Sequence, residues 1–146
     1  MRGVIQSLEE LIVPGRVLRL FCSFTNPPKE KFVVVVATTP CCLGFLINSS
    51  ATGLQKSKKH LSDEIISVSA RDGYAFLTNP QPSVLDCTFA ADFDLDELVA
   101  QLTQDPARVL GFITDATRKH IIEVVRESMT LEGGIAKIIV RNLTES

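Results

Sequence analysis

Two neighbouring apolar runs in the first half of the chain form its clearest pattern. The first is Lys31-Phe32-Val33-Val34-Val35-Val36-Ala37, and the second is Leu43-Gly44-Phe45-Leu46-Ile47. β-Branched residues lose side-chain freedom in a helix and pack well on a pleated surface, so both runs predict strands. The valines of the first run leave neither face polar, which is typical of a central strand buried on both faces.

Shorter patterns predict further elements around these two runs. The capping-box spacing Ser7-Leu8-Glu9-Glu10 predicts a short helix that begins there. The remaining predicted strands cover 16–24, 64–70, 83–88 and 109–113, and the predicted helices cover 94–103 and 115–129. The run Ile135–Val140 is expected to form a closing strand, after Gly133-Gly134 ends the long helix.

This order of elements predicts an α+β or mainly β fold. Antiparallel strands over about 15–90 would form a bent sheet or small barrel of at least five strands, with helices over about 94–131. The sequence has no internal repeat or linker, so we expect one domain spanning 1–146. A strand that is apolar on both faces needs cover on both. We therefore expect one core that contains Val34, Val36, Ile121 and Val125.

Composition narrows the classes of protein to which the chain can belong. The 146 residues are 45% hydrophobic and carry a net charge of -2, so no global field attracts nucleic acid and any polyanion binding is local. No stretch approaches the roughly 20 apolar residues of a spanning helix, and the N-terminus lacks the apolar core of a signal peptide. We expect a cytoplasmic protein without a membrane partner.

The cysteine and histidine positions argue against a metal site. Cys22, Cys41, Cys42 and Cys87 include no Cys-x-x-Cys pair, and His60 and His120 lie in different segments. The expectation is four reduced, buried cysteines with no metal and no cofactor.

Two groups of polar residues are candidates for function. The loop residues Lys56, Lys58, Lys59 and His60 could contact an RNA backbone, although solubility explains them equally well. Asp86 stands near the end of a predicted strand, where it could act as a general base or form a structural ion pair. The alternating Asp92, Asp94 and Asp96 fit a helix cap, because the glycine and distal glutamate of a calcium loop are missing.

Five short segments occur in the order found in a known family. They are Gly15-Arg16-Val17, Lys31-Phe32 before Val33–Val36, Leu46-Ile47-Asn48-Ser49, Ser83-Val84-Leu85-Asp86-Cys87 and the helix Asp115–Met129. This order resembles the PemK/MazF-like toxins, which are small SH3-like barrels that cleave messenger RNA. The resemblance implies an SH3-like barrel with antiparallel strands and C-terminal helices, a homodimer and an antitoxin-like protein partner.

The resemblance also assigns roles to single residues. The family's catalytic arginine falls at Lys31, its following proline at Phe32 and its threonine at Ser49. Lysine lacks the planar fork with which arginine holds a phosphate. Asp86 stands where related ribonucleases often carry an arginine.

Two functions remain open from the sequence. In the first, the chain is a metal-independent endoribonuclease of single-stranded RNA, in which Lys31 stabilises the phosphate charge, Ser49 bonds a phosphoryl oxygen and Asp86 or His60 moves protons. In the second, it is a catalytically inactive PemK-like barrel that binds protein or nucleic acid through the groove near 26–31 and the basic loop. The missing Arg-Pro favours the second function, and the segment order with Ser49 favours the first. Convergence of Lys31, Ser49 and Asp86 in one cleft would discriminate between them.

Overall fold

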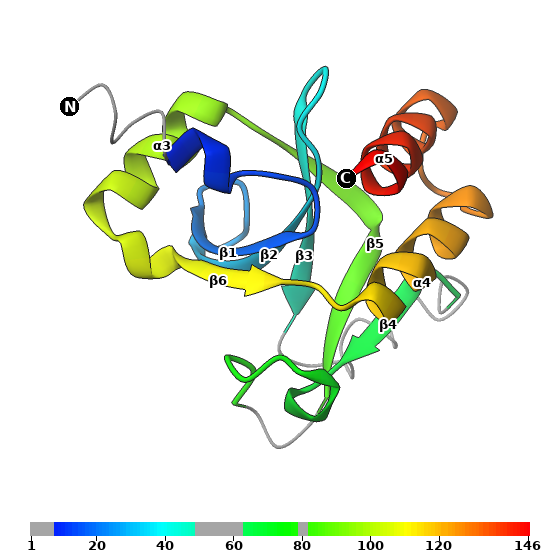
Figure 1. The fold of residues 1–146 in the computed structure, drawn as a ribbon, viewed down its shortest axis with the longest axis horizontal. Helices are drawn as coiled ribbons and strands as arrows, with labels where there is room; N and C mark the ends of the chain where they lie inside the picture. The colour runs from blue at the N-terminus through cyan, green and yellow to red at the C-terminus, as the bar shows by residue number, and fades with distance from the viewer. Residues whose placement is uncertain (1–7, 49–62, 79–81) are drawn as a thin grey trace.

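One curled antiparallel sheet organises the computed structural model, which describes residues 8–48, 63–78 and 82–146 (Figure 1). Its six strands within these residues lie in the order β4-β5-β3-β2-β1-β6, and every neighbouring pair is antiparallel. The strands are β1 (Arg16–Cys22), β2 (Lys29–Ala37), β3 (Cys42–Asn48), β4 (Ile65–Val68), β5 (Ser83–Phe93) and β6 (Val109–Phe112). The predicted bent, antiparallel sheet is confirmed, as a half-barrel with C-terminal helices.

Strand β2 lies inside the sheet and is buried on both faces, as its valines predict. Val34 and Val36 share one core with Ile121 and Val125, which confirms the predicted grouping. Val33 and Val35 point to the other face of the sheet. There they join a second core with Leu98 and Leu102 and with the N-terminal residues Leu8 and Ile12. Adjacent residues of a strand face opposite sides, so one strand contributes to two cores.

Three helices cover the sheet: α3 (Leu95–Gln104), α4 (Asp115–Arg126) and α5 (Gly133–Glu145). The Asp94 side chain accepts from the Asp96 N–H at 3.0 Å and caps α3, which confirms the predicted cap. Short 3₁₀ turns, among them η2 (Ala70–Asp72) and η3 (Pro106–Arg108), join the elements, and residues 8–11 form one helical turn. None of the helices in the described part of the chain is long and apolar enough to cross a membrane.

The predicted closing strand at Ile135–Val140 is wrong, because this run lies inside helix α5. A short β-branched run has no clear period of its own, so it fits a strand or a buried helix equally well. The surrounding residues favour a helix, because Ile135, Ile139 and Leu143 recur every four positions. Ile139 and Leu143 are buried in the core. Glu132 caps the helix by accepting from the Gly134 N–H at 2.8 Å.

Strand β5 is longer than the predicted segment 83–88 and runs to Phe93. Its first residues pair with both β4 and β3, and its later residues pair with β3 alone. The register with β3 shifts between Gly44 and Leu46, and such irregularities bend a strand. This bend contributes to the curl of the sheet.

Candidate functional site

A cleft of about 330 Å³ opens at the end of the sheet where β2 begins and β3 ends. Strands β1, β2, β3 and β5 and the segment 76–78 form its walls. We call it the β2 cleft; its residues are Arg19, Lys29, Glu30, Lys31, Phe32, Ile47, Phe76, Leu77, Thr78 and Ser83.

Two phenylalanines form the aromatic wall of the β2 cleft. The ring centroids of Phe32 and Phe76 are 4.9 Å apart and their planes meet at 55°. Tyr74 fixes the segment that carries Phe76, because its hydroxyl donates to Thr117 Oγ1 at 2.6 Å and accepts from the Thr114 N–H at 3.1 Å. The aromatic wall is therefore attached to the start of α4.

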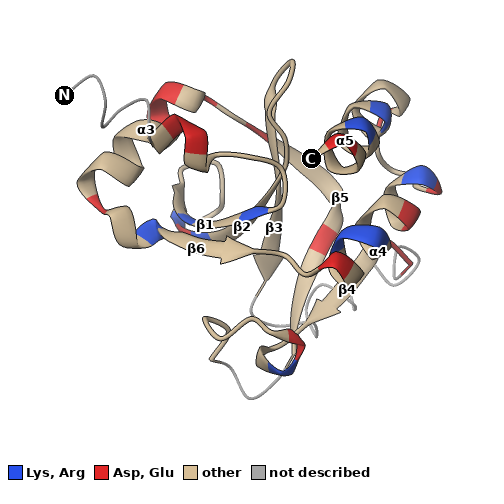
Figure 2. Ribbon diagram, viewed as in Figure 1, with Lys and Arg blue, Asp and Glu red and all other residues tan. Residues whose placement is uncertain are grey.

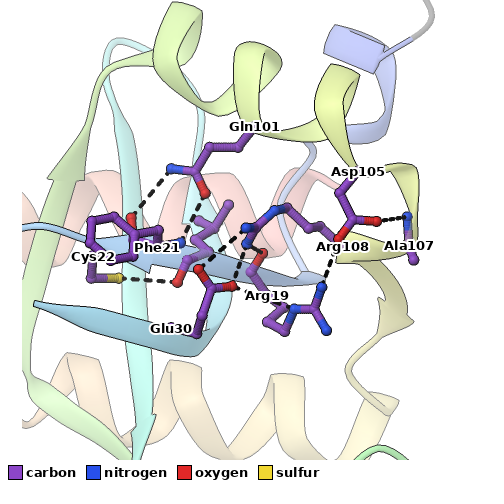
Figure 3. A network of polar contacts seen from close by, with 9 residues as sticks. Arg19, Phe21, Cys22, Glu30, Gln101, Asp105, Ala107 and Arg108 are labelled. Atoms are coloured by element: carbon purple, nitrogen blue, oxygen red, sulfur yellow. Dashed lines mark hydrogen bonds and ion pairs between the residues drawn. The ribbon is translucent and has the colours of Figure 1, made fainter.

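A network of charges holds two further cleft residues, Arg19 and Glu30 (Figure 3). Arg108 donates to both Glu30 oxygens, at 2.6 and 3.2 Å, and to the Arg19 carbonyl at 2.9 Å. Arg19 in turn donates to Asp105 at 2.8 Å. Planar guanidinium groups suit such paired contacts with carboxylates. The network places Arg19 and Glu30 in fixed positions beside the aromatic wall.

Gln101 of α3 covers the part of β1 that β6 does not reach (Figure 3). Its side-chain amide accepts from the Phe21 N–H at 2.8 Å and donates to the Phe21 carbonyl at 3.3 Å. The amide thus takes the place of a neighbouring strand. An edge strand that is covered in this way does not offer free backbone groups to another chain.

Lys31 lies at the β2 cleft, but its ammonium lies on the other face of the sheet. Lys31 has the same parity as Val33 and Val35, which face α3, and its Nζ donates to Asn48 Oδ1 at 2.7 Å. Burial lowers the pKa of the Lys31 ammonium below its ordinary value, and the charge of Lys29 lowers it further.

Asp86 lies on β5 and is not among the cleft residues. Its carboxylate accepts from the N–H of Thr88 at 2.9 Å and from the Thr88 hydroxyl. Alternation places Asp86 and Lys31 on the same face, since Asp86 opposes Leu46, and Leu46 opposes Val33. Strand β3 separates their two strands, so β2 and β5 lie about 10 Å apart. Ser49 lies outside the described residues, as do Lys56, Lys58, Lys59 and His60.

The four cysteines are free thiols, and three of them are buried. Burial raises the pKa of Cys22 and of Cys42 to about 11, and raises the pKa of Cys87 as well. A thiol with a raised pKa stays protonated at neutral pH and is a poor nucleophile. Within the described residues no group of three His, Cys, Asp or Glu side chains could hold a metal ion.

Several cleft residues, Arg19 and Phe76 among them, are not identified by the sequence analysis. Arg19 lies between the buried residues Leu18 and Leu20 in β1. The alternation of a strand therefore predicts that its side chain lies on the face opposite to theirs. Phe76 has no such signal, because a turn brings it to Phe32 from far along the chain.

Comparisons of the chain with protein-family models, with curated proteins and with solved structures give no match. The argument for function therefore depends on the chemistry of the cleft. Guanidinium and ammonium groups bind anions, and aromatic ring faces stack with flat nucleotide bases. Together they suit a ligand with a phosphate and a base.

Proposed function

We propose that the protein binds single-stranded RNA at the β2 cleft. The observation that carries the proposal is the meeting of an aromatic pair, Phe32 and Phe76, with the cations at the start of β2. Proteins that bind single strands combine a positively charged track for the backbone with rings on which bases stack. In this arrangement one base packs against Phe76, and the RNA backbone passes around the start of β2, where Lys29 and Lys31 on the other face of the sheet contact the phosphates beyond that base.

The charge distribution supports an anionic ligand at this place. Glu30 is the one acidic residue of the β2 cleft, and both of its oxygens accept from Arg108. Lys29 and Lys31 have no carboxylate partner among the described residues. A local excess of positive charge thus exists in a chain whose net charge is -2. Figure 2 shows the blue of lysine and arginine on β1 and β2.

The size of the cleft favours a single strand over a duplex. A volume of about 330 Å³ is at the small end of the range for ligand sites, and suits one nucleotide rather than a helix. Bases in a duplex are stacked and paired, so a recessed aromatic wall reaches only unpaired ones. The resemblance to SH3-like toxins that cleave messenger RNA supports the same class of ligand.

Fluorescence anisotropy with a labelled single-stranded RNA of mixed sequence tests the proposal. We expect binding that weakens with salt, and weaker binding of the matching duplex. The double variant K29A/K31A should reduce the slope of log K against log salt by about 1.4, because each lost phosphate contact contributes about 0.7. Phe76→Leu keeps an apolar side chain but removes the ring, and should cost about 1–3 kcal/mol of binding free energy.

Lys119→Ala is the matched control, because Lys119 is exposed on α4 and outside the cleft. It should bind RNA as the parent does, with a salt slope lower by less than about 0.3. The proposal fails if the single strand does not bind, or if K119A weakens binding as much as K29A/K31A does.

Cleavage of the bound RNA is a second candidate function, favoured by Lys31. The resemblance assigns the catalytic arginine to this position, and the lowered pKa makes the Lys31 ammonium a better proton donor at neutral pH. An internal 2′-hydroxyl would attack the adjacent phosphate and displace the 5′-oxygen of the next nucleotide, leaving a 2′,3′-cyclic phosphate and a 5′-hydroxyl, with Lys31 stabilising the charge that develops on the phosphate. In this candidate Ser49 would bond a phosphoryl oxygen, and Asp86 or His60 would take the proton from the 2′-hydroxyl and give one to the leaving oxygen.

Incubation of mixed-sequence RNA with the protein in EDTA tests for cleavage. Lys31→Ala should slow the reaction about 100- to 1,000-fold, as loss of a positioned donor does at other oxyanion sites. Lys31→Arg should retain cleavage, because it restores a planar fork. Intact RNA at high protein concentration excludes this candidate and leaves the binding proposal in place.

Light scattering tests the homodimer that the resemblance implies, since the chain mass is 16.0 kDa.

A further inference from the structure

A groove of about 610 Å³ runs between α4 and α5, on the side of these helices that the sheet does not cover. Gly133, Ala136, Val140 and Thr144 line it at spacings of three and four residues, so it follows one face of α5. This stripe is about 16 Å long at 1.5 Å per residue. Figure 1 shows α4 and α5 side by side at the C-terminal end of the fold.

The floor of this α4–α5 groove is apolar and its rim is basic. Val125, Leu131 and Val140 supply apolar side chains, of which Leu131 and Val140 are only partly buried. Arg126, Lys137 and Arg141 stand exposed around them, against one acidic residue, Glu145. None of these three cations has a carboxylate partner within the described part of the chain.

We propose that the α4–α5 groove binds an acidic, amphipathic helical segment of a partner protein. An amphipathic helix places apolar residues in such a groove at i, i+3, i+4 and i+7. The small residues Gly133 and Ala136 allow a third helix to approach α5 closely, and acidic residues beside its apolar stripe meet the three unpaired cations. About three turns of helix match the length of the stripe.

A second copy of this chain does not offer such a helix among its described residues. The acidic helix of the protein is α3, with Asp96 and Glu97 in its first turn. Its apolar side chains Leu98, Val99 and Leu102 are already buried in the core beneath α3. The charge complementarity therefore points to another protein. The groove shares no residue with the β2 cleft, so this inference is independent of RNA binding.

A labelled helical peptide of about four turns is the probe, with leucines at i, i+3, i+4 and i+7 and glutamates elsewhere. We expect the acidic peptide to bind with micromolar affinity, and the same peptide with lysines in place of glutamates to bind at least about tenfold more weakly. Amide chemical shifts of the labelled protein should change at α4 and α5 and not at β1 or β2.

The double variant K137E/R141E should weaken binding of the acidic peptide about tenfold or more and strengthen binding of the basic one. Lys119→Glu is the matched control, since Lys119 is exposed on α4 and outside the groove, and it should change neither affinity more than about twofold. Because all three substituted residues are exposed, these variants should fold as the parent does.

Three results would overturn the proposal. The first is no binding of the acidic peptide, or equal binding of the acidic and basic peptides. The second is dimerisation that K137E/R141E reverses, which would assign the groove to a second copy. The third is sedimentation with vesicles of phosphatidylcholine and phosphatidylserine, without peptide binding, which would assign it to a membrane surface.

Discussion

At the scale of single residues, Glu64 connects two distant parts of the fold. Its buried carboxylate accepts from the hydroxyls of Ser128 and Thr130 and from the Met129 N–H at 3.2 Å. These contacts hold the turn after α4 against the start of β4. They also explain why α4 ends at Arg126 and not at Met129, since the residues after Arg126 turn to meet the carboxylate.

Replacing Glu64 with glutamine should destabilise the protein most at neutral pH. Burial alone would raise the pKa of Glu64, but the hydrogen bonds outweigh it and hold the pKa below its usual range. The ionised form therefore stabilises the fold above the unfolded pKa of about 4.3, and this stabilisation is lost as pH falls through the lower folded pKa. We expect Glu64→Gln to lower the free energy of unfolding at pH 7 by about 1–3 kcal/mol.

Urea denaturation at pH 7 and at several values below about pH 5 measures this effect. The difference between parent and Glu64→Gln should shrink as the pH falls. Glu123→Gln, on the exposed side of α4, is the control and should stay within about 0.5 kcal/mol of the parent. A difference between parent and Glu64→Gln that is constant over the whole pH range would contradict the role of the charge.

Gly44 permits close packing between β2, β3 and β5. A Cβ at this position would lie 2.5 Å from Val33 Cγ1 and 2.9 Å from the Phe93 ring, both of which are held in the core. Gly44→Ala should therefore lower the free energy of unfolding by about 1–3 kcal/mol, as overpacking does. Gly133→Ala is the matched control, because a Cβ there meets nothing within 4 Å at the start of α5. Chemical denaturation should show it as neutral or slightly more stable than the parent.

At the scale of elements, α5 is joined to the sheet by one buried amide as well as by its apolar face. Asn142 Oδ1 accepts from the Thr38 N–H at 3.0 Å and Nδ2 donates to the Thr39 carbonyl at 2.9 Å. These bonds satisfy backbone groups of the turn between β2 and β3. The apolar residues Ile139 and Leu143 pack beside them into the core.

Asn142→Ala should free the β2–β3 turn from α5. The variant removes the partner of half-buried and exposed backbone groups at Thr38 and Thr39, so we expect a loss of about 0.5–1.5 kcal/mol in the free energy of unfolding. Hydrogen exchange of the Thr38 amide should become faster than in the parent. Exchange of the α3 amides should change only as much as the global free energy of unfolding changes. Unchanged protection at Thr38 would show that the contact with α5 does not hold the turn.

At the scale of the whole molecule, β2 belongs to both cores and couples them. Val33 and Val35 pack beneath α3, whereas Val34 and Val36 pack against α4 and α5. Because both cores pack against β2, a loss of packing in one core displaces the strand and weakens packing in the other core. The two cores are therefore expected to unfold together, in a single transition.

Val34→Asp and Val33→Asp should both prevent soluble, cooperative folding. Each variant buries an unpaired charge, since the parent side chains are 1% and 0% exposed. Ser67→Asp on β4 is the control, because Ser67 is an exposed strand residue and its variant should fold normally. Soluble yield and thermal unfolding measure the outcome. A Val33→Asp protein that keeps a folded α4–α5 half would show that the two cores are independent.

Patterns between near neighbours in the sequence were enough to predict most elements. The valines of β2 indicate a strand buried on both faces, and the spacing of Asp94 and Asp96 indicates a helix cap. Pro-Gly and Asn-Pro breaks, such as Pro14-Gly15 and Asn26-Pro27, lie at the ends of other strands. These features are local, because each depends on side-chain and backbone preferences within a few residues.

Tertiary structure decided the features that depend on distant partners. Ile135–Val140 is helical because Ile139 and Leu143 complete a core that the run alone does not specify. The face on which the Lys31 ammonium lies follows from the register of β2 with its neighbours, and a shift of one residue would reverse it. The cleft itself joins Arg19, Phe32 and Phe76 from three segments. Such a site is a property of long-range pairing, which no short stretch of sequence encodes.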